Sequence, residues 1–96
     1  MDKETIKKEL VDKSNDILAR YSEPEDVEDI SIMNMSSKIV FLGSLRVYDE
    51  TNVPKIKRDL TNDLNKYGDL SIRDQKVTPC CAPSYFHISY NISVEN

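Results

Sequence analysis

The sequence predicts an α+β domain in the order α-β-β-α-β-β, with a four-stranded, mainly antiparallel sheet and two helices on one face. Three patterns predict this fold class: two segments with apolar residues at helical spacing, one long apolar segment mid-chain, and a final segment that alternates strictly. Each helix has one apolar stripe and the last strand has one apolar face. Packing both helices on one face of a single sheet would bury all of these apolar residues. The 96 residues suit one domain, residues 1–96.

The first helix is expected to begin at a cap on Asp2 and to run to about Tyr21. Its apolar residues recur three, four or seven positions apart and therefore share one face, namely Ile6, Leu10, Ile17, Leu18 and Tyr21. Pro24 ends the helix, because proline cannot continue the hydrogen-bond ladder and disfavours helix at Glu23.

Two strands are expected next. Residues 29–35 predict a short strand, and residues 34–37 a polar turn. Residues 38–48 predict a central strand, because their first half is apolar on both faces. Gly43 lies in the middle of that strand and indicates a bulge or a close approach of backbone.

The second helix is expected to begin at a cap on Thr51 or Asn52, with Pro54 in its first turn. Its apolar stripe is Ile56, Leu60, Leu64 and Tyr67. Gly68 follows where a left-handed residue often ends a helix, so we expect that conformation there.

The last two strands are expected at residues 70–77 and 85–94, joined by a loop that contains two prolines. The first has a half-exposed or edge pattern, whereas the second alternates over ten residues and predicts one face in contact with water. The element order is that of a circularly permuted ferredoxin-like βαββαβ arrangement, in which the final strand replaces the missing first one. This is an analogy of fold and implies no function.

Charge and composition exclude several functions. The chain has 13 Lys and Arg against 17 Asp and Glu, a net charge of -4, which disfavours nucleic acid as a partner. Residues 1–29 hold ten acids and five bases, or -5. No apolar run reaches the roughly 18 residues of a membrane helix, and two glycines leave no phosphate-binding loop. We therefore expect a non-enzymatic, cytoplasmic protein without a cofactor or a membrane association.

The source and the partner are open questions at this stage. Abundant Lys, Asn, Asp, Ile and Ser indicate AT-rich codons, which are typical of bacteriophages and mobile elements but also of many cellular genomes. If a phage encodes the protein, its compartment is the host cytoplasm. The partner is expected to be another protein or a second copy of this chain.

The leading functional hypothesis is an interaction or assembly protein that acts through a sheet edge and the acidic N-terminal region. Residues 22–29 contain five carboxylates, which can dock on a basic protein or imitate a phosphate backbone. The last strand has no Lys or Glu on its polar face before its end, so we expect an unprotected edge that pairs with another chain. A place in the middle of the sheet is the alternative. The candidate interaction residues are Glu25, Asp26, Glu28, Asp29, His87, Ser89 and Asn91.

Two alternatives belong to other classes of protein. A nucleic-acid-associated regulator would use the basic cluster on the second helix, Lys55, Lys57 and Arg58. A small metal or redox protein would use Cys80, Cys81 and His87. Zinc usually takes cysteines in separated pairs, and adjacent cysteines are expected to point apart, so we assign no metal ligands.

Overall fold

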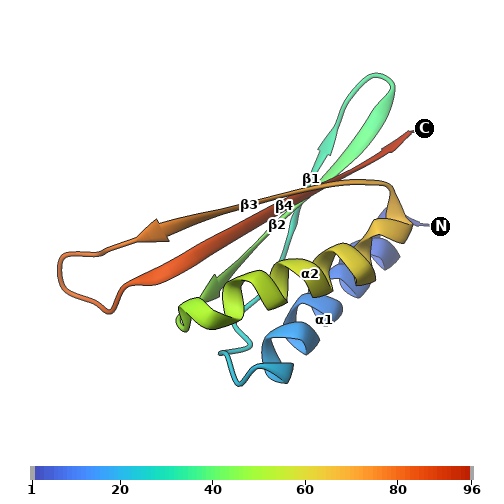
Figure 1. Ribbon diagram of the computed structural model, residues 1–96. Helices are drawn as coiled ribbons and strands as arrows, with labels where there is room; N and C mark the ends of the chain where they lie inside the picture. The colour runs from blue at the N-terminus through green and yellow to red at the C-terminus, as the bar shows by residue number, and fades with distance from the viewer. Residues whose placement is uncertain (1, 96) are drawn as a thin grey trace.

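The computed structural model describes residues 2–95 and confirms the predicted order of elements (Figure 1). The elements are α1 (Lys3–Arg20), β1 (Ser31–Asn34), β2 (Lys38–Val47), α2 (Val53–Leu64), β3 (Asp69–Val77) and β4 (Tyr85–Glu95), with 3₁₀ turns at Glu50–Asn52 and Asn65–Tyr67 on either side of α2. Both helices lie against the same face of the sheet. We call the opposite face the open face. Among the described residues, no helix is long and apolar enough to cross a membrane.

The sheet is fully antiparallel and has the order β1-β2-β4-β3. β4 pairs with β2 along ten residues and with β3 along nine, so it is an interior strand. The expectation that the last strand forms an edge is therefore wrong, and the edges are β1 and β3. The polar residues of β4 lie on the open face, and its backbone groups face two neighbouring strands. An interior last strand is also the position that the permuted ferredoxin-like order requires.

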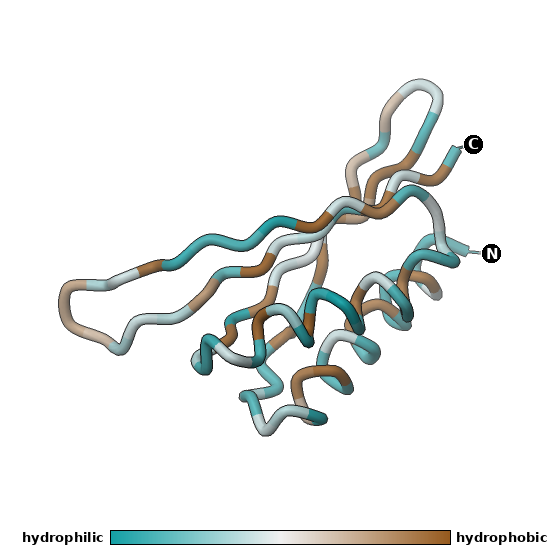
Figure 2. Tube along the Cα trace, viewed as in Figure 1, coloured by the Kyte–Doolittle hydropathy of each residue, from teal (hydrophilic) through white to brown (hydrophobic). Residues whose placement is uncertain are grey.

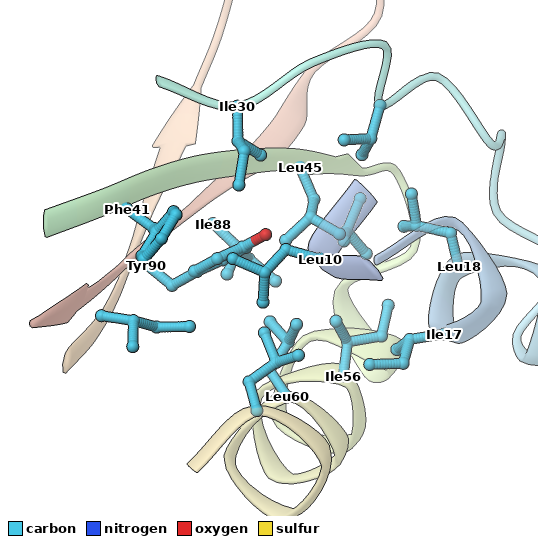
Figure 3. Packing of buried hydrophobic residues seen from close by; sticks show 14 of the residues in the cluster. Leu10, Ile17, Leu18, Ile30, Phe41, Leu45, Ile56, Leu60, Ile88 and Tyr90 are labelled. Atoms are coloured by element: carbon cyan, nitrogen blue, oxygen red, sulfur yellow. The ribbon is translucent and has the colours of Figure 1, made fainter. Parts of the chain in front are cut away.

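The core lies between the helices and the covered face of the sheet (Figure 3). Apolar residues of both helices and of β2 and β4 are buried in this core. Figure 2 shows hydrophobic and hydrophilic residues interspersed along both helices. The largest fully buried side chains are Phe41, Leu10, Ile17, Leu18, Leu45, Ile56, Leu60, Leu64, Ile88, Ile92, Val47 and Ser14. The stripes and faces predicted from periodicity are therefore the ones that face the core, although Tyr21 and Tyr67 at the ends of their stripes are only partly buried.

α1 ends in a Schellman motif that the proline signal alone does not reveal. Ser22 has a left-handed backbone with φ of 57°. The Ser22 N–H donates to the Ala19 carbonyl over 3.2 Å, and the Glu23 N–H donates to the Leu18 carbonyl over 3.0 Å. These two bonds satisfy carbonyls that the helix end would leave unpaired, and they turn the chain back towards the sheet.

Both ends of α2 differ in detail from the prediction. The N-cap residue of α2 is Asn52, one of the two predicted, but its side chain makes no capping hydrogen bond. The side-chain cap is instead on Asp49, before the 3₁₀ turn that precedes α2, and its carboxylate accepts from the Thr51 N–H at 3.0 Å and from the Thr51 hydroxyl at 2.7 Å. Gly68 is extended, with φ of 160°, and the expected left-handed residue is absent from this position. A Cβ at Gly68 would lie 2.4 Å from the Ser93 carbonyl oxygen. Close approach of the β4 backbone therefore explains this glycine.

Candidate interaction surface

The acidic segment Glu23–Ile30, which we call the acidic strap, has no regular secondary structure but is anchored to α1. The Asn15 side chain donates to the Val27 carbonyl over 2.9 Å and accepts from the Val27 N–H over 3.0 Å. One amide side chain thus pairs with both backbone groups of Val27, as a neighbouring strand would. Val27 and Ile30 are buried in the core. These contacts give the strap a defined path.

Glu23 anchors the other end of the strap. It is only 7% exposed, and its carboxylate accepts from the Tyr48 N–H at 2.8 Å and the Asp49 N–H at 3.2 Å. The Asn52 side-chain amide donates to the same carboxylate over 2.8 Å. Three donors around one buried carboxylate offset the loss of its hydration. Glu23 therefore joins the start of the strap to the loop between β2 and α2.

The remaining four acids of the strap are the ones predicted to mediate interaction. Asp29 forms an ion pair with Lys7 at 3.1 Å. The hydrogen bond from Lys7, helped by one from the backbone N–H of Ile30, lowers the pKa of Asp29. Glu25, Asp26 and Glu28 are exposed, and within residues 2–95 they form no ion pair. Three carboxylates are thus free on a segment that is fixed in place.

A concave region of about 520 Å³ lies where the strap meets β2 and β4. Its lining residues are Asp26, Val27, Glu28 and Asp29 from the strap, Ser44, Leu45 and Arg46 from β2, and Tyr85 and His87 from β4. Its size is within the range of binding pockets, but its lining is dominated by charged and polar groups, whereas small-molecule sites are mostly apolar. The region therefore suits a charged segment of a partner.

The strand side of this concave region carries cationic and aromatic groups. The Arg46 guanidinium lies 5.0 Å from the centre of the Tyr85 ring. Tyr48 is 42% exposed, and its ring centre lies 6.0 Å from that of Tyr85. Because Arg46 pairs directly with His87 in the β2–β4 register, a guanidinium and an imidazole line the region together with the strap carboxylates. The site therefore combines carboxylates from the strap with one cationic side chain from β2.

Of the predicted residues on β4, His87 alone lines the concave region. Ser89 pairs with Ser44 and Arg73, and Asn91 pairs with Leu42 and Ser71. Their side chains are on the same face as His87, because residues two apart along a strand share a face. Ser89 and Asn91 therefore lie on the open face, and neither belongs to a sheet edge.

The basic cluster of α2 is partly used within the fold. Lys57 forms an ion pair with Asp74 of β3 at 2.6 Å. Arg58 donates to the Tyr21 hydroxyl over 3.3 Å and lies 3.4 Å from Asp59. Lys55 is exposed. Because two of the three cations already contact neighbouring residues, the geometry favours the nucleic-acid alternative less than the strap.

The cysteines do not join His87. Across residues 2–95 there is no group of three or more His, Cys, Asp or Glu side chains placed to hold a metal ion. Cys80 and Cys81 are exposed, and their Sγ atoms are 3.2 Å apart. The expectation that the adjacent cysteines point apart is therefore wrong, because they lie in a turn, where successive side chains need not alternate as they do along a strand.

Sequence reasoning missed what holds this surface together. Asn15 has a backbone segment as its partner, which no residue spacing indicates. Glu23 is counted with the acids of its segment, although the sequence contains one hint of a different role, its place directly before Pro24 at a helix end.

Comparison of the chain with protein-family models, with curated proteins and with solved structures finds no match.

Proposed function

We propose that this chain is a small, non-enzymatic interaction protein that binds its partner through the acidic strap and the adjoining part of the open face. The observation that carries the proposal is the concave region that joins Asp26, Glu28 and Asp29 to Arg46, Tyr85 and His87. Residues far apart in the sequence line this region together, and the strap that carries the acids is anchored by Asn15 and Glu23. Preorganised groups of this kind lose little entropy on binding, which favours affinity.

The charges at this site indicate which chemical groups a partner would carry. Carboxylates of the strap attract Lys or Arg side chains, and complementary charge raises the rate of association. Arg46, with His87 beside it, suits a carboxylate or carbonyl acceptor on the same partner. Tyr85 and the exposed Tyr48 supply aromatic surface, which is enriched at protein interfaces. A protein segment with a basic residue near an acceptor group fits this arrangement.

A titration of the ¹⁵N-labelled protein with a short lysine- and aspartate-containing peptide tests this proposal by NMR. We expect amide shifts to change along residues 26–29, 44–46 and 85–87. The triple variant Glu25→Gln, Asp26→Asn, Glu28→Gln should weaken binding at least about tenfold, because charge pairing supplies much of the encounter energy. Raising the salt concentration should weaken wild-type binding in the same direction.

The matched control removes the same charge elsewhere. Asp12→Asn, Glu50→Gln and Glu95→Gln neutralise three exposed acids outside the strap and leave the net charge equal to that of the strap variant. This control should bind as the wild type does. If both triple variants lose affinity equally, or if the shifts gather on α1 and α2, the peptide senses only net charge and the proposed surface is wrong.

A further inference from the structure

The hairpin of β3 and β4 extends past both helices, and its tip carries the two cysteines (Figure 1). Cys80 and Cys81 occupy the turn of a loop that Pro79 and Pro83 flank. Proline restricts the backbone on both sides of this turn. The turn brings the two side chains together, with both residues exposed and their Sγ atoms 3.2 Å apart.

We propose that Cys80 and Cys81 form a two-thiol site for a soft, three-coordinate centre of the trivalent arsenic class, in which an organic group keeps the third position. This site is independent of the acidic strap. An organic arsenoxide condenses with both thiols: two arsenic–sulfur bonds form, the arsenic–oxygen bond breaks, and the two thiol protons leave with the oxygen as one water. Arsenic stays trivalent throughout, so the step needs neither an oxidant nor a reductant.

The separation of the two free thiols is closer to the one that a right-angled ion requires than to those of other thiol-binding ions. With metal–sulfur bonds of about 2.3 Å, a tetrahedral zinc ion would hold two sulfurs about 3.8 Å apart and a linear ion about 4.6 Å. A pyramidal ion with an angle near 90° at the same bond length requires about 3.3 Å. The observed 3.2 Å agrees with the pyramidal geometry.

The surroundings of the thiols favour the same assignment. Structural zinc needs four ligands, and no third His, Cys, Asp or Glu joins the two thiols within the described chain. A disulfide between them would close a strained ring, because adjacent Cα atoms are about 3.8 Å apart, below the range of ordinary disulfides. Inserting one arsenic atom enlarges that ring and relieves the strain.

Intact-mass spectrometry of the reduced, full-length chain with phenylarsine oxide tests the site. We expect one adduct per chain, with the mass of one reagent molecule less one water. A large excess of a monothiol should leave the adduct in place, whereas dithiothreitol should remove it. Cys80→Ser and Cys81→Ser should each weaken binding on the order of 10²-fold, because the second bond then becomes intermolecular.

Three results would overturn the assignment. One is a single-serine variant that retains the arsenical in monothiol as well as the wild type does. Another is two arsenicals per chain, or one arsenical joining two chains, since each means that the thiols act separately. The third is stoichiometric zinc that the arsenical does not displace. Circular dichroism of both serine variants should match the wild type, because the substituted side chains are exposed.

Discussion

Tyr90 lies across Gly43, the residue directly opposite it in the β2–β4 register. A Cβ atom at Gly43 would lie 2.4 Å from the Tyr90 Cζ, closer than any real contact. The buried hydroxyl of Tyr90 forms a 2.9 Å hydrogen bond with Ser14 of α1. Gly43 therefore makes room for a side chain that links β2, β4 and α1. The glycine marks a close approach, as predicted, but the approaching group is an aromatic ring.

Gly43→Ala should destabilise the protein by about 1–3 kcal/mol, because the added methyl group overpacks a filled core. Urea unfolding followed by circular dichroism measures the loss. In a Tyr90→Leu background the same substitution should cost much less, since the ring is gone, and the difference gives the coupling between the two positions. Equal costs in both backgrounds would show that the ring does not determine the need for glycine.

Glu23→Ala should cost about 1–3 kcal/mol, because it removes a buried carboxylate that accepts from the part-buried N–H groups of Tyr48 and Asp49. It should also speed amide exchange at Val27, whose segment Glu23 anchors. Glu25→Ala is the matched control, since this neighbouring acid is exposed, and its effect should stay within about 0.5 kcal/mol. If both variants unfold at the same urea concentration, the carboxylate of Glu23 has no anchoring role.

Ser22→Gly should stabilise the protein by about 0.5–1 kcal/mol, because Ser22 has a left-handed backbone that glycine adopts without strain. Ser22→Ala should show no such gain, since its Cβ remains. The midpoints of urea unfolding for the two variants test this directly. A lower midpoint for the glycine variant would mean that the serine side chain contributes more than the strain it causes.

The protein should lose stability in alkaline solution as Tyr67 ionises. Burial, together with the 3.0 Å hydrogen bond to Glu9, raises the pKa of Tyr67 to about 12. A raised pKa favours folding below the ordinary value of 10.0, and this contribution disappears as the pH rises from there to about 12. Urea unfolding across this range should show a smaller decline in Tyr67→Phe. An identical decline would assign the effect to other groups.

Most of the fold could be predicted from residue types at short spacing in the sequence. Periodicities of 3.6 and 2 identify helices and strands from neighbouring residues alone, so each predicted element is present. Most boundaries shift by a residue or two, but α2 ends at Leu64 and the predicted last turn to Tyr67 is a 3₁₀ turn. The same patterns placed Ile88, Tyr90 and Ile92 on one face of the last strand, and all three are buried. The acidic residues of the strap were also identified, because an uneven charge is visible without any structure.

The candidate surface was less accessible to sequence reasoning. Alternation in β4 reports which face meets water, but it says nothing about which strands lie on either side. The polar row that contains Ser89 and Asn91 was therefore assigned to a free edge when it belongs to an open face. The permuted arrangement predicted for the whole chain already required an interior last strand. It therefore predicted the position of β4 in the sheet better than the polar pattern of that strand did.

The sequence by itself determined the elements, their buried faces and the acidity of the strap, because these follow from residue types at short spacing. Tertiary structure alone decided that Tyr90 meets Gly43, that Asn15 and Glu23 hold the strap, and that the strap faces Arg46 and His87. Those contacts join segments separated by many residues. They depend on the order of the strands and on how the helices pack against the sheet. Neither can be deduced from local sequence patterns.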